Sequence, residues 1–229
     1  MFEQYLPQFK QTGLFNSLQD EDIIGMMPCF SASETKCIKG DILFQAGDRQ
    51  TTIGIVVRGE IHIQKEDYAG NRFLVNVLSP GDMFGEVSAF ANIDRWANTV
   101  LAGDDSSVVF IRVERISKPC CRVCASHQVL IENMLKIVAR KALHMNSRIN
   151  YLKLRGMREK LANFLMEQSL KNGRTTFDLP MNREALADFL NVSRPSMSRE
   201  LGRMRDEGII DFYRSSFVIK NVEALKQMI

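Results

Sequence analysis

The sequence predicts an α+β fold in three parts, and three patterns along the chain support this prediction. Short apolar runs separated by glycine turns fill residues 37–113, which favours a β-sandwich or β-roll. Residues 126–153 contain no proline or glycine and have helical periodicity. The remaining residues hold short amphipathic segments followed by two strand-like runs, which indicates a second, smaller domain.

The composition is that of an ordinary globular protein, with 45% apolar and 25% charged residues in a chain of 229. We expect domain boundaries at 1–125, 126–154 and 155–229. The start of the chain, with Glu3 and Gln4, lacks the basic and apolar segments of a signal peptide. No run approaches the roughly 20 apolar residues of a membrane span. We therefore expect a cytoplasmic protein without a membrane partner.

The excess of positive charge lies in the last third of the chain. Residues 155–229 hold 13 Lys and Arg against 10 Asp and Glu, whereas residues 1–154 hold 17 of each. A surplus of this sign and place favours contact with nucleic acid through the C-terminal part.

The glycine-rich first part has a particular spacing. Ile42 and Leu43 are followed by Gly47 and Asp48, then by the apolar run 53–57. This arrangement resembles the cyclic-nucleotide-binding β-roll, in which glycines serve the tight corners between strands.

The predicted long helix carries a heptad seam, because its apolar residues recur at alternating spacings of four and three. Such a seam either packs inside its own domain or joins two copies of the helix. Its length and its place between two domains favour a dimerisation helix. Residues 154–156 then break the pattern and form the expected hinge. The seam consists of Ile131, Leu135, Val138, Ala142, Met145, Ile149 and Leu152.

Residues 182–201 have the pattern of two helices joined by a tight turn. Ala187 is small enough for the helices to cross, and Asn191 tolerates a left-handed turn. Ser193 is the expected N-cap of the second helix, with Pro195 in its first turn. The apolar anchors of the pair are Leu186, Leu190, Val192, Met197 and Leu201.

Polar residues gather at the start of this second helix, the end that enters the major groove in helix-turn-helix proteins. Arginine suits guanine, and serine suits phosphates or base edges. Two strand-like runs around an Arg-Ser-Ser turn then predict a wing. The alternative is a structural helical hairpin with solvated arginines. The expected DNA contacts are Asn182, Arg183, Ser193, Arg194, Ser196, Ser198 and Arg199.

The order of β-roll, heptad helix, hinge and winged helix-turn-helix resembles the CRP/FNR family of bacterial transcription regulators over nearly the whole chain. The resemblance implies a homodimer joined along the long helix, a two-fold symmetric operator in double-stranded DNA, and contact with RNA polymerase. Half-sites would lie about one helical turn apart. Pro195 stands where many members carry a glutamate that accepts a hydrogen bond from cytosine, so we expect a different operator.

In the cyclic-AMP-binding members, a Gly-Glu pair and a downstream Arg-Ser/Thr-Ala hold the phosphate. This sequence has Gly85-Glu86 and Arg95-Trp96-Ala97, so a bulky indole replaces the hydroxyl donor. Losing a hydrogen bond to a charged group costs on the order of 1.5–3 kcal/mol. The sequence therefore disfavours cyclic AMP. The alternative for Glu86 and Arg95 is an internal ion pair in a roll without a nucleotide.

A second candidate sensor is the triplet Cys120, Cys124 and His127, which would share one face of a helix. Thiolate and imidazole suit zinc, an iron–sulfur cluster or a haem, and Cys29 or Cys37 would complete the ligand set. The alternatives are a thiol switch without metal, and small apolar residues that pack the helix start. The residues alone leave the cofactor open.

Two other function classes compete with a DNA-binding regulator. An effector-binding roll that acts only through protein partners is disfavoured by Arg194 and Arg199 in the second helix. An enzyme is disfavoured because the sequence has no glycine-rich phosphate loop opening a helix, no assignable nucleophile and base, and only three histidines.

Overall fold

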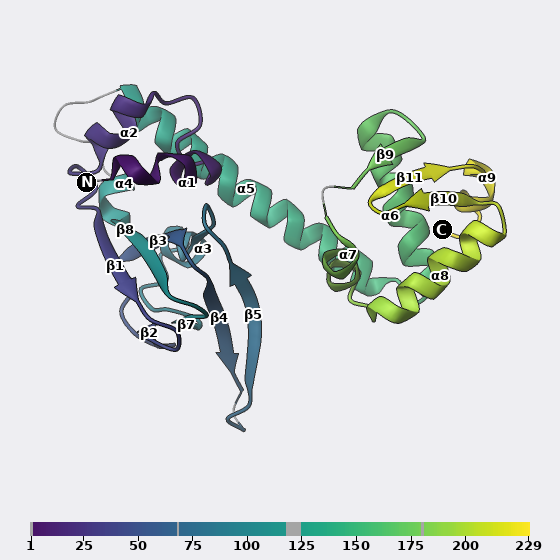
Figure 1. Ribbon diagram of the computed structural model, residues 1–229, viewed down its shortest axis with the longest axis horizontal. Helices are drawn as coiled ribbons and strands as arrows, with labels where there is room; N and C mark the ends of the chain where they lie inside the picture. The colour runs from purple at the N-terminus through teal and green to yellow at the C-terminus, as the bar shows by residue number, and fades with distance from the viewer. Residues whose placement is uncertain (1, 68, 118–124, 180) are drawn as a thin grey trace. The chain divides into compact units, whose positions relative to one another are not determined.

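The computed structural model describes residues 2–67, 69–117, 125–179 and 181–229 (Figure 1). Its packing divides the chain into two compact units, Met1–Arg140 and Lys141–Ile229. Within the described ranges, no helix combines the length and the apolar character that crossing a membrane would require. The predicted α+β class is confirmed, because each unit combines helices with antiparallel sheet.

The N-terminal unit is a β-roll of two four-stranded antiparallel sheets, with strand orders β1-β8-β3-β6 and β2-β7-β4-β5. Five short helical elements accompany it: η1 (Glu3–Tyr5), α1 (Leu6–Gln11), α2 (Asp20–Met26), α3 (Glu86–Phe90) and α4 (Val113–Ser117). The strands are β1 (Ser33–Cys37), β2 (Ile42–Phe44), β3 (Thr52–Arg58), β4 (Ile61–Glu66), β5 (Arg72–Leu78), β6 (Met83–Phe84), β7 (Thr99–Ala102) and β8 (Ser106–Arg112).

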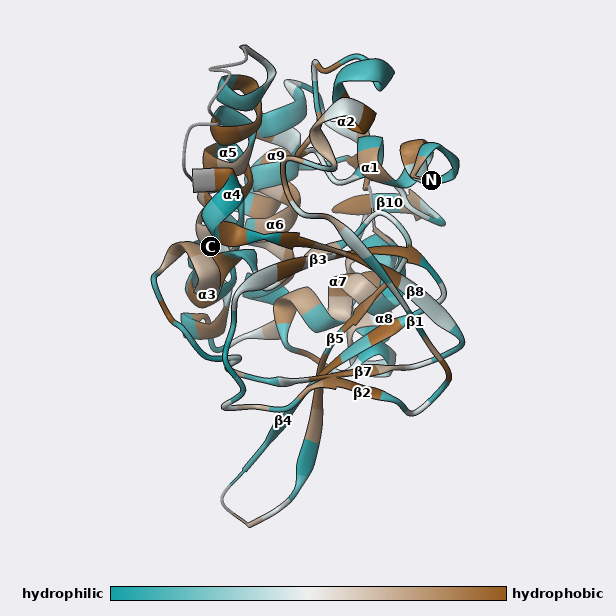
Figure 2. Cartoon of the chain, turned by 90° about the vertical axis from the view of Figure 1, so that its left-hand side faces the viewer, coloured by the Kyte–Doolittle hydropathy of each residue, from teal (hydrophilic) through white to brown (hydrophobic). Residues whose placement is uncertain are grey.

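The central strands β3 and β8 are nearly continuous apolar runs, brown over much of β3 in Figure 2, because both of their faces are buried. Ile55 on one face of β3 packs in the core beneath the N-terminal helices, and Val56 on the other face packs in the core between the two sheets. The corner at Gly59 needs glycine, since φ is +77° and a Cβ would lie 2.4 Å from the Asp105 carbonyl oxygen.

The long helix α5 (Ala125–Lys153) begins in one unit and ends in the other. Near its start, Leu130 and Met134 are buried in the core beneath the N-terminal helices. The buried side chain of Asn133 donates hydrogen bonds to the carbonyl oxygens of Leu14 (3.1 Å) and Asn16 (2.7 Å). Near its end, Tyr151 is buried in the core of the C-terminal unit. The predicted helix is therefore present, but the packing divides inside it and not at residues 154–156.

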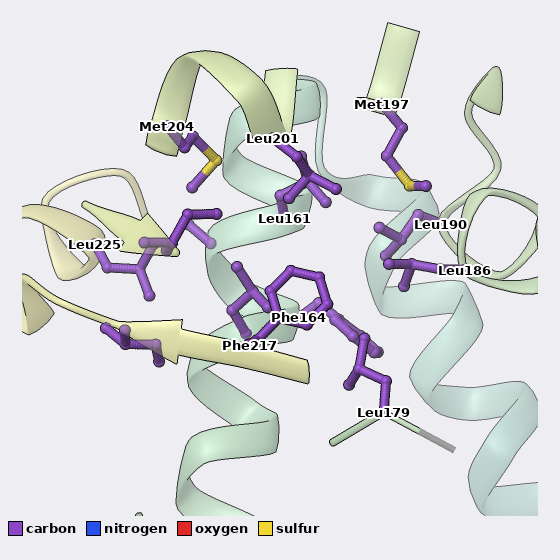
Figure 3. Packing of buried hydrophobic residues seen from close by; sticks show 14 of the residues in the cluster. Leu161, Phe164, Leu179, Leu186, Leu190, Met197, Leu201, Met204, Phe217 and Leu225 are labelled. Atoms are coloured by element: carbon purple, nitrogen blue, oxygen red, sulfur yellow. The ribbon is translucent and has the colours of Figure 1, made fainter. Parts of the chain in front are cut away.

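In the described residues of the C-terminal unit, four helices and the end of α5 pack around a three-stranded sheet of order β10-β11-β9. Figure 3 shows its core, to which Phe164 of α6, Leu190 of α7, Leu201 of α8 and Phe217 of β11 all contribute. The strand β9 was not predicted. The elements of the C-terminal unit after α5 are α6 (Met157–Asn172), β9 (Thr176–Asp178), α7 (Arg183–Leu190), α8 (Arg194–Asp206), β10 (Ile210–Tyr213), β11 (Ser216–Ile219) and α9 (Val222–Lys226).

Candidate nucleic-acid interface and effector pocket

Helices α7 and α8 form the predicted helix-turn-helix. The side chain of Asn182 caps α7 by accepting a hydrogen bond from the Ala185 amide at 2.9 Å. Asn191 ends α7 in the left-handed conformation, with φ of +51°. Ser193 holds the N-cap position of α8, but its side chain makes no capping hydrogen bond. The expected cap is therefore right in position and wrong in its hydrogen bond, which leaves the Ser193 hydroxyl exposed at the helix start.

The first turns of α8 separate apolar from polar side chains. Met197 is fully buried, whereas Arg194, Ser198 and Arg199 are exposed and Ser196 is half-buried. Arg199 donates to the Ser196 hydroxyl at 3.0 Å. Arg194 makes a 2.8 Å salt bridge to Glu184, and both partners are exposed, so releasing Arg194 costs little. The structure thus places these four predicted contacts together at one accessible helix end.

Arg183 lies differently from the other predicted contacts. Its guanidinium packs 4.8 Å from the ring centre of Phe212 and 4.5 Å from that of Phe217. Desolvation lowers the pKa of this group, and its buried Nη2 has no hydrogen-bond partner. These contacts attach α7 to the β-hairpin through cation–π interaction. A phosphate contact by Arg183 stays a prediction, and the structure adds this packing role.

Two features near α8 were missed from the sequence. Arg158 of α6 bonds Glu200 of α8 at 2.6 Å and Glu207 with two contacts of 2.8 Å, which fixes the back of α8 to α6. The hairpin tip exposes Tyr213 and Arg214. The wing hairpin itself was predicted around the Arg-Ser-Ser turn and is confirmed by the pairing of β10 with β11, whereas the exposure of Tyr213 beside that turn was not singled out. The contacts of Arg158 had no local sequence signal, because its partners lie more than 40 positions away.

In the β-roll, the space beside the candidate phosphate-binding residues Gly85, Glu86, Arg95 and Trp96 is occupied by the protein's own side chains. Trp96 is only 5% exposed and stacks on Phe44 with ring centres 4.5 Å apart. A Cβ at Gly85 would lie 2.6 Å from the indole, so the ring covers the start of α3. The polar groups there are engaged as well, since Gln50 donates to the Gly85 carbonyl oxygen at 2.6 Å and accepts from Ser88 at 2.8 Å.

The two charged members of this group of four residues differ in burial. Glu86 is 1% exposed, whereas Arg95 is at the surface and donates to the Gly47 carbonyl oxygen at 2.7 Å. The indole Nε1–H of Trp96 is buried without a hydrogen-bond partner, so apolar packing holds the ring in place. The indole of Trp96 lies close over Gly85, whereas Glu86 is buried and Arg95 is exposed, so these four residues do not line an open anion pocket.

The predicted metal ligands are described only in part, because Cys120 and Cys124 lie outside the described residues. Cys29 is exposed. His127 is buried, and its Nε2 lies 3.0 Å from the Ile116 carbonyl oxygen, while its Nδ1 has no hydrogen-bond partner. Among the residues that the structure describes, no group of three ligand side chains could hold a metal ion.

The predicted dimer seam on α5 is largely uncovered. Leu135 is 66% and Met145 61% exposed, and Ile149 and Leu152 are exposed as well. Ile131 and Val138 are half-buried, and Ala142 is exposed. A row of large apolar side chains facing water is the expected state of an isolated chain whose seam pairs with a second copy.

Comparison with known proteins agrees with this architecture. Residues 34–120 match the cyclic nucleotide-binding domain family, and residues 159–228 match the Crp-like helix-turn-helix domain family. The CRP-like cAMP-activated global transcriptional regulator of Mycobacterium tuberculosis is 23% identical over 215 residues, covering 88% of this chain and 92% of that protein.

Two further relatives cover similar lengths. The Global nitrogen regulator of Synechococcus elongatus is 24% identical over 202 residues, covering 82% of this chain and 86% of that protein. The crystal structure of the Thermus thermophilus Catabolite Activator Protein matches with a TM-score of 0.53 at 19% identity, covering 94% of this chain and 97% of that one.

Proposed function

Because the chain belongs to the CRP/FNR family of transcriptional regulators, we propose that it is a homodimer that reads a two-fold symmetric site in double-stranded DNA. The observation that carries this proposal is the start of α8, where Arg194 and Arg199 are exposed while Met197 anchors the helix from behind. Arginine in this place suits guanine in the major groove. Asn182, Arg183, Ser193, Ser196 and Ser198 are the accompanying contacts.

The dimer would form along α5. Its exposed apolar seam, Leu135 and Met145 above all, is the surface that a second copy of the helix would cover. Two recognition helices related by a two-fold axis would then meet half-sites about one helical turn apart. As in the family, we propose RNA polymerase as the protein partner and the cytoplasm as the place of action. The proposed functional domains remain 1–125, 126–154 and 155–229.

The sensor domain, we propose, responds to something other than cyclic AMP, although one relative is named as cAMP-activated. The indole of Trp96 occupies the space over Gly85 in which a phosphate would lie. A metal, iron–sulfur or haem sensor is the second candidate, and it is favoured by the buried Nδ1 of His127, which has no hydrogen-bond partner among the described residues. Anaerobic purification with iron and zinc analysis, repeated on Cys124→Ala, tests it: bound metal lost in the variant supports a ligand role.

The DNA-reading role is tested with Arg199→Ala. A binding site is first selected from random DNA with the wild-type protein, and affinity is then measured by fluorescence anisotropy. We expect the variant to lose about 1–3 kcal/mol of discrimination at each half-site. Arg174→Ala is the matched control, since Arg174 is an exposed arginine outside α7 and α8.

The salt dependence of binding separates sequence-specific recognition from nonspecific electrostatic attraction to DNA. Binding to unrelated DNA should fall with salt in both variants, because phosphate contacts release counterions. An Arg199→Ala protein that bound the selected site with unchanged affinity and selectivity would refute the assignment.

A further inference from the structure

The last turns of α5 are packed as part of the DNA-binding domain. Tyr151 is 5% exposed in the same core as α6, α7 and α8. Its ring centre lies 6.1 Å from that of Phe164 and 5.2 Å from that of Phe189, and its hydroxyl donates to Glu167. The ring of His144, two turns earlier on α5, lies 5.2 Å from that of Phe189. The helix end is therefore joined to α6 and α7 by a continuous aromatic cluster.

Two cations hold the end of α7, where the turn into α8 begins. Arg148 of α5 donates to the Asp188 carbonyl oxygen at 3.1 Å. Lys160 of α6, only 7% exposed, donates to the Leu190 carbonyl oxygen at 3.0 Å. The last carbonyls of a helix carry partial negative charge and can accept a second hydrogen bond, so they suit cationic donors; the Asp188 carbonyl oxygen, for example, also accepts from the Asn191 amide at 3.1 Å. Arg148 thereby links the orientation of the recognition helix to the long helix.

The junction at residues 154–156 is also held. Leu154 packs against the same core, and the Gly156 amide donates to the Glu159 carboxylate at 3.3 Å. Because both sides of the junction contact one core, rotation within it cannot re-aim α8 relative to the end of α5. Further up the helix, all five side chains from Ala139 to Leu143 are exposed. This stretch lies between the last partly buried contact of α5 with the sensor core, Val138, and the aromatic cluster.

We infer that Arg148 is a positioning residue for DNA binding, and that α5 from His144 to Lys153 moves with the recognition helix as one body. The joint that responds to the sensor then lies between Val138 and His144, and not at residues 154–156 as the sequence pattern suggested. This inference rests on the proposed function, since it concerns how a dimer presents its two copies of α8.

The test compares Arg148→Met with two probes of the junction. Gly156→Ala stiffens residues 154–156 without a steric cost, because its φ is −85° and a Cβ would meet nothing closer than 3.5 Å. Arg155→Met removes an exposed arginine at the same place. The selected site is rebuilt with its half-sites moved by one and two base pairs in each direction, and affinity is measured for every spacing.

We expect the wild type, Gly156→Ala and Arg155→Met to share one sharp spacing preference. Arg148→Met should reduce the preference for the best spacing about tenfold, as for the loss of one hydrogen bond from a charged donor. Arg148→Lys should restore much of it. A variant that was merely less stable would lose affinity equally at every spacing. The inference is overturned if Gly156→Ala changes the spacing profile while Arg148→Met leaves it intact, or if Arg148→Met lowers affinity equally throughout.

A second measurement needs neither a dimer nor DNA. Amide hydrogen exchange of the free protein should show Arg148→Met speeding exchange at residues 145–153 and at the turn 190–192 together, with the β-roll unchanged. Faster exchange in only one of the two segments would contradict the single body. If the wild type selects no symmetric site, the dimer proposal fails, and exchange alone decides the role of Arg148.

Discussion

Two helix starts in this protein resemble each other in sequence chemistry and differ in access. Helix α3 begins after Gly85, with Arg95 a short distance along the chain, and α8 begins after Ser193, with Arg194 and Arg199. The first is covered by the indole of Trp96, whereas the second presents exposed arginines and a free Ser193 hydroxyl. Both have the groups that attract anions, but only α8 leaves room for one.

The comparison shows that a sequence motif can be required by the local backbone conformation without any bound ligand. The Gly85 turn persists because the strand β6 must leave its sheet and enter α3, and φ of +84° there favours glycine whatever the roll binds. Arg194 and Arg199 at the start of α8 have no comparable structural duty, since their contacts are with exposed Glu184 and half-buried Ser196. Exposed polar residues without a packing role are the stronger indication of binding.

The largest effect is expected for a substitution in the proposed dimer seam, because the exposed start of α8 would read a two-fold symmetric DNA site only as part of a dimer. Leu135→Asp places a carboxylate in the proposed α5 seam. Losing two buried leucines per dimer removes about 3–6 kcal/mol of association free energy, and desolvation of the charges adds to this. The dimer should therefore dissociate at concentrations where the wild type is dimeric, and affinity for the selected DNA site should fall with it. Sedimentation velocity measures the dissociation.

Lys136→Asp is the matched control for the seam. It lies next to Leu135, is exposed, and changes the charge by more, so a purely electrostatic effect would be larger there. A Leu135→Asp protein that stayed dimeric while Lys136→Asp dissociated would place the interface on another face of the helix.

The next prediction concerns the covered start of α3 and uses the variant Trp96→Ala. Truncating this buried indole should cost about 3–5 kcal/mol of unfolding free energy, because the space over Gly85 is left without contacts. Phe73→Ala, at an exposed position of β5, should cost less than about 1 kcal/mol. Urea denaturation followed by circular dichroism measures both.

Titration with cyclic AMP tests whether the indole of Trp96 stays in the space over Gly85 or can move out of it. Isothermal titration should detect no binding to the wild type, since the ring occupies the space over Gly85 in which we propose that the phosphate would have to lie. Clear saturable binding to the wild type would show that Trp96 moves aside. The start of α3 would then differ from the start of α8 only in the unliganded conformation, and the residue at position 96 would not prevent binding.

The sequence predicted the elements whose pattern is local. The heptad helix, the left-handed turn at Asn191 and the position of Ser193 all follow from the residues at those places. The helix α6 ends before Gly173, which adopts the left-handed conformation that favours glycine at a helix end. Local signals of this kind depend on only a few neighbouring residues.

The sequence did not predict which side chains meet across the fold. A phosphate contact by Arg183 stays a prediction, but its packing on Phe212 and Phe217 was not predicted, because the chain order does not reveal which aromatic faces a guanidinium meets. The residues 154–156 were expected to bend because their pattern breaks the heptads. We infer a different joint from the contacts that Arg148 and Tyr151 of α5 make with α7, and these partners are far apart in sequence.

The smallest effect separates the two duties of Asn182. Its side chain caps α7, so Asn182→Ala should cost about 1 kcal/mol of stability. Asn221→Ala is a matched control, because Asn221 caps α9 in the same way, accepting from the Ala224 amide at 3.0 Å. Both variants should lower the unfolding free energy of the C-terminal domain by similar amounts.

Only Asn182→Ala should also weaken binding to the selected DNA site, because α7 and not α9 lies in the proposed interface. The weakening should be similar for specific and unrelated DNA, as for a phosphate contact that carries no sequence information. Equal DNA affinity in the two variants would confine Asn182 to capping, and the accessible chemistry of this domain would then lie at α8 alone.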